Sequence, residues 1–285
     1  MEVGIKIQGQ IINNLRFADD IVLIAPSEND LQTLVDKVQE WSKKFSLTIN
    51  ISKTQVQVIG KESRKINIKI DGKDLEQVDS FVYLGGVITE SSSSEGDIKT
   101  RIGLAMGVMQ KLNSIWKSSE ITIQTKLELY RVLVLSIATY GCETWTLKKK
   151  DEQRLLVFEM ACLRKIRGVT RLDKIRNTAI RESLNFHISI VNRVRAKQLT
   201  YFGHVKRMSP LRYPKVTLEG IIPGKRPRGR PPMRWLDNIK TNCNFVGLGS
   251  VVEAGRVARD RSTWKLLVAR QLSPEPSSNV LGGQL

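Results

Sequence analysis

The chain has 285 residues, enough for one large or two ordinary domains, and 41% of them are hydrophobic, which excludes a wholly disordered protein. Its 46 basic and 28 acidic residues give a formal net charge of +18, which favours a polyanionic partner such as nucleic acid or an acidic membrane surface. The charge is uneven, because residues 1–100 carry 12 basic and 15 acidic residues and the whole positive excess lies in residues 101–285.

The three cysteines, Cys142, Cys162 and Cys243, are odd in number and lack the spacing of a zinc knuckle. We therefore expect reduced thiols in an intracellular protein, cytoplasmic or nuclear, rather than a disulfide framework or a structural zinc. The longest apolar runs are short and interrupted by charge, so no membrane span is predicted, and the residues from Met1 onward do not have the pattern of a secretory signal.

The first distinctive stretch places Asp19 and Asp20 between two apolar runs. Leu15 and Phe17 before the pair and residues 21–24 after it alternate as in strands, which predicts a β-hairpin, buried on both faces, with the two aspartates at its turn. Adjacent carboxylates repel each other, so such a turn is either solvated or a site for a divalent cation. From these residues alone, the solvated turn is the more frequent case.

A helix is predicted next, because Ser27 precedes Asp30 with the spacing of a capping box. Residues 48–54 then lead into a strand at residues 55–58, with Lys53 near its entry. The apolar residues of the helix recur at helical period, as expected for a face packed in a core: Leu31, Leu34, Val35, Val38, Trp41 and Phe45.

Two hairpins are predicted before residue 90. The alternating Ile66, Ile68 and Ile70 lead into Asp71-Gly72, a strong hairpin signal. Residues 81–88 read as a second strand pair, in which the paired glycines Gly85 and Gly86 permit close backbone approach.

Beyond a polar run at residues 91–96, the periodicity becomes helical. The helix predicted at about 150–167 turns Leu155, Phe158, Cys162 and Ile166 inward and its basic residues outward. From Ser273 onward, the chain is expected to be disordered. The predicted helical ranges are about 98–116, 123–137, 150–167, 173–184, 189–207 and 235–243, with a further pattern up to Leu272.

Residues 201–240 hold 10 basic and 2 acidic residues and are the candidate nucleic-acid-binding region. Four prolines and two glycines in residues 223–234 exclude regular helix or sheet there, so an extended arm is predicted. Trp235, at helical spacing with Ile239, is more often a packing residue than one that stacks on a base. The candidate binding residues are Lys206, Arg207, Lys225, Arg226, Arg228, Gly229, Arg230 and Arg234.

Three blocks of the first 90 residues, in order and spacing, resemble the back half of a reverse transcriptase palm from a non-LTR (LINE-type) retrotransposon. Phe17-Ala18-Asp19-Asp20 matches that family's metal motif, residues 47–54 look like its next block, and residues 81–86 are similar to its primer-gripping strand. Three blocks in this order are a more specific signal than one motif, and they favour the metal-site interpretation of the two aspartates.

The resemblance implies roles for single residues. Asp19 and Asp20 would be catalytic ligands of Mg²⁺, and Lys53 would lie near the triphosphate and assist departure of pyrophosphate. The implied partners are an RNA template, a DNA primer or target, and deoxynucleoside triphosphates in the intact enzyme. The residues that would grip the primer terminus are Tyr83, Leu84, Gly85 and Gly86.

The resemblance also implies an order of domains and an α+β fold. Residues 1–90 would be a partial polymerase palm of antiparallel hairpins and a helix, and residues 91–147 thumb-like helices that include the Tyr140–Trp145 motif. Residues 148–272 would be a basic helical region like the carboxy-terminal part of the endonuclease-encoding members, with the extended arm at 223–234. Residues 273–285 would be a disordered tail.

The chain also departs from the family. Two-metal polymerisation needs carboxylates from separate strands, and the family's other metal carboxylate lies upstream, whereas the 18 residues before Asp19 contain no aspartate. The fingers, the endonuclease domain and the family's cysteine and histidine cluster are not recognisable. We therefore expect a carboxy-terminal piece of such an element that binds nucleic acid and does not polymerise DNA by itself.

Two alternatives stay open. Residues 226–232 resemble an AT-hook, in which an extended Arg-Gly-Arg lies in a narrow minor groove. An arm that merely neutralises phosphates and a basic linker on a folded surface are together slightly favoured over the hook. The chain is alternatively an inactive relic, whose hairpin at residues 17–24 would expose an apolar edge that invites aggregation.

Overall fold

The computed structural model describes residues 3–60, 64–220 and 232–272. The chain divides into two compact units. Met1–Gly96 with Met208–Pro231 form one, called here the N-terminal unit, and Asp97–Arg207 with Pro232–Leu285 form the other, called the helical unit. The predicted ranges 91–147 and 148–272 both contribute to the helical unit and share its core.

The N-terminal unit is built from short strand pairs around one long helix. Its described strands form five two-stranded sheets, antiparallel except for the parallel pair of β5 and β8. The elements are β1 (Ile5–Ile7), β2 (Gln10–Ile12), β3 (Asn14–Phe17), β4 (Asp20–Leu23), α1 (Glu28–Lys44), η1 (Ile51–Lys53), β5 (Gln55–Val56), β6 (Lys69–Ile70), β7 (Lys73–Asp74), β8 (Glu76–Gln77), β9 (Ser80–Tyr83), β10 (Gly86–Thr89) and α9 (Tyr213–Glu219).

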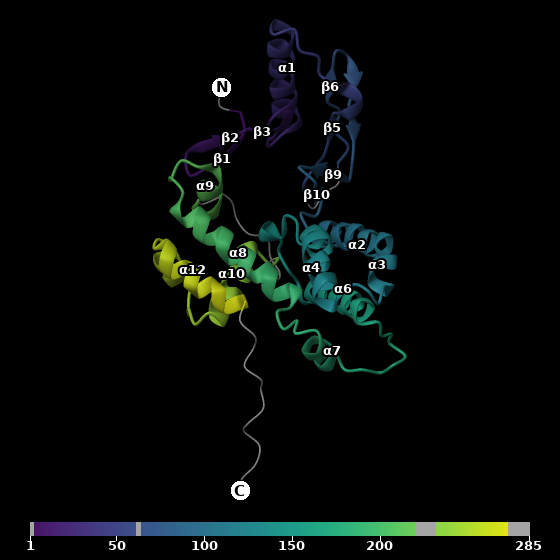
Figure 1. The fold of residues 1–285 in the computed structure, drawn as a ribbon. Coiled ribbons are helices and arrows are strands. Elements are labelled where there is room, and N and C mark those ends of the chain that lie inside the picture. The colour runs from purple at the N-terminus through teal and green to yellow at the C-terminus, as the bar shows by residue number, and fades with distance from the viewer. Residues whose placement is uncertain (1–2, 61–63, 221–231, 273–285) are drawn as a thin grey trace. The chain divides into compact units, whose positions relative to one another are not determined.

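The helix α1 begins where the capping signal predicts. The Ser27 hydroxyl accepts a hydrogen bond from the Asp30 backbone N–H at 3.2 Å, which confirms the cap. Leu34 and Val35 are the buried residues of α1, and Val35 belongs to a small core with Val56, Ile68 and Ile70. Figure 1 shows α1 beside β6.

The prediction that the whole apolar face of α1 is core is wrong for its last turns. Trp41 is 56% exposed and Phe45 68% exposed, and the two rings stack with centroids 6.1 Å apart. The small core of this unit packs against the first half of the helix, so the later apolar side chains pack on each other instead.

The hairpins form as predicted, but the first one is less buried than expected. β3 and β4 pair with Arg16 opposite Ile21 and Phe17 opposite Asp20, while Phe17 is 61% and Ile21 47% exposed. A sheet of two strands covers little area, and only the end of β4, at Leu23, packs on the small core. The expectation of a hairpin buried on both faces is therefore wrong.

Tight turns close the other two predicted hairpins. Asp71 and Gly72 have φ of +48° and +75°, and Leu84 and Gly85 have φ of +48° and +80°. Such left-handed backbone is easiest for glycine, which explains Gly72 and Gly85. For Gly86 the expected close backbone approach is not found, since a Cβ there would meet only the Tyr83 carbonyl oxygen at an ordinary 3.5 Å.

The helical unit follows the predicted helices closely. The continuous segment from α4 to α5 contains a π-helical part, η2, in its middle. The helix predicted from about residue 173 begins four residues later, at Asn177. The elements are α2 (Glu95–Lys111), α3 (Asn113–Lys117), α4 (Ile123–Leu129), η2 (Tyr130–Leu135), α5 (Ser136–Ala138), η3 (Cys142–Thr144), α6 (Lys149–Arg167), α7 (Asn177–Ser183), α8 (Ile190–Arg207), α10 (Trp235–Phe245), α11 (Val251–Val257), α12 (Arg261–Ala269) and η4 (Arg270–Leu272).

One large core holds α2 to α8 together, and its side chains include the predicted inward residues of α6. A buried amide joins three distant segments of this unit. The Gln198 side chain on α8 donates to the Trp145 carbonyl oxygen at 2.9 Å and accepts from the Asn242 side chain on α10 at 2.8 Å. Because Gln198 is fully buried, these bonds also satisfy groups that would otherwise be costly to bury.

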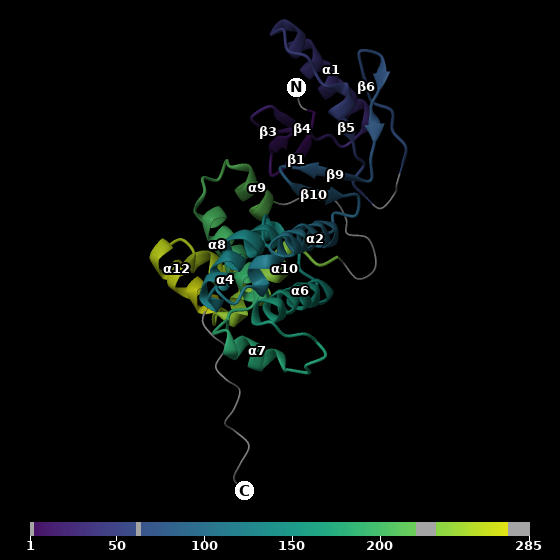
Figure 2. The same cartoon turned by 45° about the vertical axis from the view of Figure 1, so that its right-hand side comes forward.

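Contacts between aromatic rings pack α10 and α12 against α8. Phe202 lies between Trp235, at 6.4 Å, and Trp264, at 5.8 Å between ring centroids. Trp235 also donates from its indole nitrogen to the Glu143 carbonyl oxygen at 2.8 Å, so the prediction that it is a packing residue is confirmed. α12 lies along α8 in both views (Figure 1, Figure 2).

The combination of small sheets and many helices agrees with the predicted α+β class. No helix in the described ranges is both long and apolar enough to cross a membrane. The palm and thumb assignments stay predictions.

Candidate functional site

The hairpin of β3 and β4 places Asp19 in its turn and Asp20 at the first position of β4. Ala18 takes a left-handed φ of +50° to close the two-residue connection between Phe17 and Asp20. Both carboxylates are exposed and make no hydrogen bond or ion pair with a described residue. The hairpin thus presents two adjacent acidic groups to solvent, available to a cation.

The donor set around this turn is incomplete for a two-metal centre. Within residues 3–60, 64–220 and 232–272, no group of three or more histidine, cysteine, aspartate or glutamate side chains is placed to hold a metal ion. Two bridging ions need further carboxylates on a neighbouring segment. Asp19 and Asp20 therefore fit part of one Mg²⁺ site and do not fit the complete pair that polymerisation uses.

Lys53 lies on η1, a segment that packs on the same small core as β4 of the acidic hairpin. It is the last residue of η1, its backbone N–H is bound by the Asn50 side chain at 3.1 Å, and its side chain is exposed. Leu23 of β4 and Ile51 of η1 both pack on the cluster that contains Val56. The fold thereby brings the segments that carry Asp19, Asp20 and Lys53 onto one core, without a contact among the three side chains.

The residues predicted to grip a primer occupy the β9–β10 turn. Leu84 and Gly85 form the turn itself, between Tyr83, the last residue of β9, and Gly86, the first of β10. The Gln57 side chain ties the end of this hairpin to the segment after β5, because it donates to the Asp79 and Ile88 carbonyl oxygens at 2.9 and 3.2 Å. The hairpin is thus anchored at its open end, opposite the turn.

The predicted nucleic-acid residues have mixed surroundings. Arg207 donates to the Ala258 carbonyl oxygen at 2.6 Å, and Lys206 lies 5.8 Å from the Phe202 ring, so both help to hold the end of α8. Arg234 pairs with Asp237 at 3.2 Å at the start of α10. Lys225, Arg226, Arg228, Gly229 and Arg230 lie outside the described residues.

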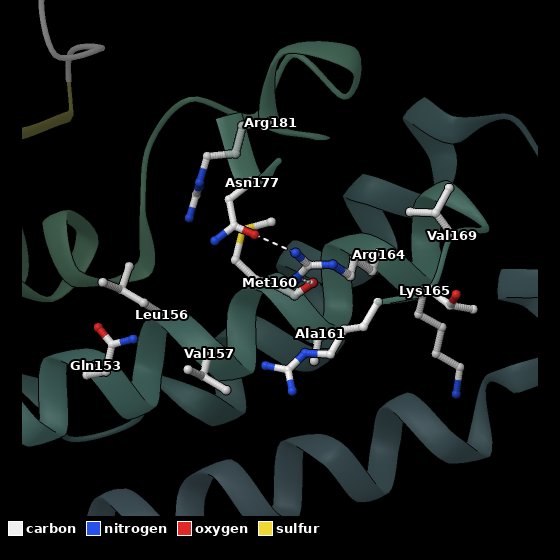
Figure 3. A pocket seen from close by; sticks show the side chains of 12 residues that line it. Gln153, Leu156, Val157, Met160, Ala161, Arg164, Lys165, Val169, Asn177 and Arg181 are labelled. Carbon is white, nitrogen blue, oxygen red and sulfur yellow. Dashed lines mark hydrogen bonds between the residues drawn. The ribbon is translucent and has the colours of Figure 1, made fainter. Parts of the chain in front are cut away.

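A pocket that was not predicted lies on α6. It has a volume of about 810 Å³ and is walled by one face of α6 and by the segment from Val169 to Arg181 (Figure 3). The signal was present in the sequence, because Gln153, Leu156, Val157 and Met160 recur at helical spacing on the side of α6 opposite Phe158 and Cys162.

Beneath this pocket lies a buried carboxyl group, Glu159 of α6. Arg181 of α7 forms an ion pair with it, yet burial raises the pKa of Glu159 above its usual value. Burial also raises the pKa of the neighbouring Tyr130 phenol and lowers that of Arg193. Among the described residues, the Tyr130 hydroxyl, Glu159 Oε1 and Arg193 Nε have no hydrogen-bond partner.

The three cysteines are free and buried. Burial raises the pKa of Cys142 and Cys162 to about 12 and that of Cys243 to about 11. All three thiols therefore stay protonated near neutral pH, and they behave as packing residues of the helical unit.

Comparison with known proteins relates the N-terminal unit to a polymerase family. Residues 4–88 match the family model of reverse transcriptase (RNA-dependent DNA polymerase). The chain is 26% identical over 274 residues to an uncharacterized transposon-derived protein of Caenorhabditis elegans, an alignment that covers 93% of this chain and 98% of the relative. No solved structure matches the chain. The segment with the acidic hairpin, Lys53 and the β9–β10 turn is therefore similar to a reverse transcriptase, and nearly the whole chain is similar to a transposon-derived protein.

Proposed function

We propose that this chain is a nucleic-acid-binding protein derived from the reverse transcriptase of a non-LTR retrotransposon, and that it does not polymerise DNA by itself. The observation that carries the proposal is the pairing of two properties in one chain. Residues 4–88 match a reverse transcriptase, and residues 101–285 hold the whole positive excess. A protein of this ancestry and charge suits RNA or DNA as a partner.

The second part of the proposal follows from the donor set of the acidic hairpin. Mg²⁺ is commonly bound by one or two carboxylates together with water and substrate phosphates, and Asp19 and Asp20 can supply these two. The second ion of a polymerase needs another carboxylate, and no described cluster supplies it. We therefore expect at most one weakly held Mg²⁺ at the turn and no nucleotide transfer.

Binding is tested by titrating the whole purified chain into labelled single-stranded RNA, single-stranded DNA and duplex DNA at several salt concentrations. Log affinity should fall linearly with log salt, by about 0.9 for each phosphate contacted on duplex DNA and about 0.7 on single strands. Affinity that is micromolar or weaker for all three and independent of salt would contradict the proposal.

Catalysis is tested by primer extension on an RNA template with Mg²⁺ and all four deoxynucleoside triphosphates. We expect no extension. Extension that disappears in the Asp19→Ala variant, while circular dichroism shows that the variant is folded, would show that the chain polymerises alone and would overturn this part.

The AT-hook-like hypothesis for residues 226–232 stays a prediction, since these residues lie outside or at the edge of the described ranges. It predicts a preference for A·T over G·C duplexes that is lost in Arg228→Ala or Arg230→Ala. Equal binding to both duplexes would leave simple phosphate neutralisation by the arm.

A further inference from the structure

The pocket on α6 has an apolar floor, and part of this floor is exposed. Leu156, Val157, Met160 and Ala161 line this floor, and of these Met160 belongs to the large core and Leu156 packs against it. Val157 is 47% exposed, and Ala161 is exposed as well. A helix that is apolar on two sides ordinarily has both sides covered, so the outer side of α6 is suited to a ligand.

The opposite wall of the pocket is held in place by defined contacts. Gly168, with φ of +76°, ends α6 and turns the chain back, and the Asp173 carboxylate accepts hydrogen bonds from the Thr170 N–H at 2.6 Å and hydroxyl at 2.9 Å. The Arg164 guanidinium donates to the Asn177 side chain across the pocket (Figure 3). Walls that exist before binding reduce the entropy lost when a ligand is ordered.

The rim of the pocket is cationic. Of the 12 residues that line it, four are basic, namely Arg164, Lys165, Arg171 and Arg181, and none is acidic. Arg181 is compensated by Glu159, and Arg164 contacts only neutral groups, the Asn177 side chain and the Met160 carbonyl oxygen. The side chains of Lys165 and Arg171 make no hydrogen bond or ion pair with a described residue. Three positive charges around the floor therefore form no ion pair with a described carboxylate, and the Asp173 carboxylate in the opposite wall is bound to Thr170.

A ligand that matches this pocket has flat apolar faces and regularly spaced negative charges. Unpaired bases joined by phosphodiesters have both, whereas a duplex hides the faces of its bases. The volume of about 810 Å³ suits one or two nucleotides. Arginine guanidinium planes also stack on bases, so the rim can contact base faces as well as phosphates.

We propose that the α6 pocket binds a short single-stranded segment of nucleic acid. Lys165, Arg164 and Arg171 contact the phosphodiesters, and one or two unpaired bases lie on Val157 and Ala161. This inference rests on the proposed function, because it names the place where the helical unit grips a single strand. It concerns another part of the chain than the predicted basic arm at residues 223–234, because the described residues that line the pocket lie between Gln153 and Arg181.

The test compares two charge-reversed variants of the whole chain. Lys165→Glu/Arg171→Glu changes the pocket, and Lys240→Glu/Lys265→Glu makes the same change in net charge on α10 and α12, away from it. Anisotropy with labelled oligonucleotides of about 12 residues, as single-stranded RNA, single-stranded DNA and duplex DNA, measures affinity against salt.

We expect the pocket variant to lose about tenfold more affinity for single strands than the control variant and to lower the salt slope on single strands by about 1.4, which is two phosphate contacts. Val157→Asp should weaken single-strand binding and leave duplex binding unchanged. Photocrosslinking of the wild-type chain to 4-thiouridine RNA should mark a peptide within residues 153–171. Circular dichroism of each variant confirms folding.

The outcomes separate the two proposals. If the wild-type chain binds no nucleic acid, the proposed function fails and this inference fails with it. If the chain binds but the pocket and control variants lose affinity equally, the pocket inference alone is overturned. Displacement of the oligonucleotide by polyglutamate of equal charge and concentration would also overturn it, because the base-binding floor would then have no role.

Discussion

The two units of this chain have different balances between core and surface. In the helical unit, the largest cluster contains 24 buried hydrophobic residues, whereas the two described clusters of the N-terminal unit contain five and three. The N-terminal unit exposes large apolar side chains instead, among them Phe17, Trp41, Phe45, Leu47 and Val82. The N-terminal unit, whose residues 4–88 match the reverse transcriptase family model, thus has the smaller core. A match in sequence therefore gives no measure of how well a unit is packed.

Charge also differs along the chain, although the boundary does not coincide with that of the units, because the basic residues 208–231 belong to the N-terminal unit. Residues 1–100 have a net charge of −3 and contain the acidic hairpin, while residues 101–285 have a net charge of +21. Self-repulsion of such a basic surface destabilises a compact state, and the large core of the helical unit offsets it. The comparison therefore predicts that stability is concentrated in the helical unit.

The sharpest test of this comparison substitutes one tryptophan in each unit. Trp264→Ala removes a side chain that is 2% exposed and should lower the free energy of unfolding of the helical unit by about 3–5 kcal/mol. Trp41→Ala removes one that is 56% exposed and should cost less than about 1 kcal/mol.

Urea denaturation followed by circular dichroism measures both effects. Similar losses from Trp264→Ala and Trp41→Ala would show that the two units do not differ in packing.

A second pair of variants tests how closely α12 approaches α8. A Cβ at Gly203 would lie 2.2 Å from the Trp264 indole nitrogen, so Gly203→Ala should destabilise the helical unit by about 1–3 kcal/mol. At Gly103 in α2 a Cβ would meet nothing within 4 Å, and Gly103→Ala should stabilise by about 0.5–1 kcal/mol. The same substitution thus has opposite signs, and thermal denaturation that shifts both variants in one direction would contradict the contact.

A smaller effect concerns the buried Glu159. Its folded-state pKa is raised above 4.5 by burial, so the folded chain keeps a proton over a range where the unfolded chain has lost it. The free energy of unfolding should therefore fall as pH rises from about 4.5 through the folded-state pKa. Glu159→Gln removes this titration, so the free energy of unfolding, measured by urea denaturation, should depend less on pH above about 4.5. A steeper decline in the variant than in the wild-type chain would reverse the assignment.

The sequence predicted the helices and hairpins well, because caps, turns and helical periodicity depend on neighbouring residues. Ser27 caps α1, Asp71-Gly72 closes a hairpin, and the inward face of α6 enters the core, each from a few neighbouring residues. The order of the blocks around Asp19, Lys53 and Tyr83 likewise predicted the similarity to reverse transcriptase over residues 4–88.

Which apolar side chains are buried depends on contacts between segments that are distant in the sequence. The apolar residues Phe17, Ile21, Trp41 and Phe45 have the spacing of core positions, yet they are exposed because burial needs a second surface, which their own segments do not contain. On the outer face of α6, the helical spacing of the apolar residues is visible in the sequence. The face forms a pocket wall only because Asn177 and Arg171 of a later segment lie opposite it.

The sequence by itself determined the chemistry that each segment offers: two adjacent carboxylates at a turn, a basic second half, and helices with apolar faces. The tertiary structure decided which of these groups meet. It brought the segments that carry Asp19, Asp20 and Lys53 onto one small core, gave the hairpin no third metal ligand among the described residues, and assembled the cationic pocket on α6. The physical reason is that charge and periodicity belong to neighbouring residues, whereas burial, ligand number and pocket shape depend on segments that are distant in sequence.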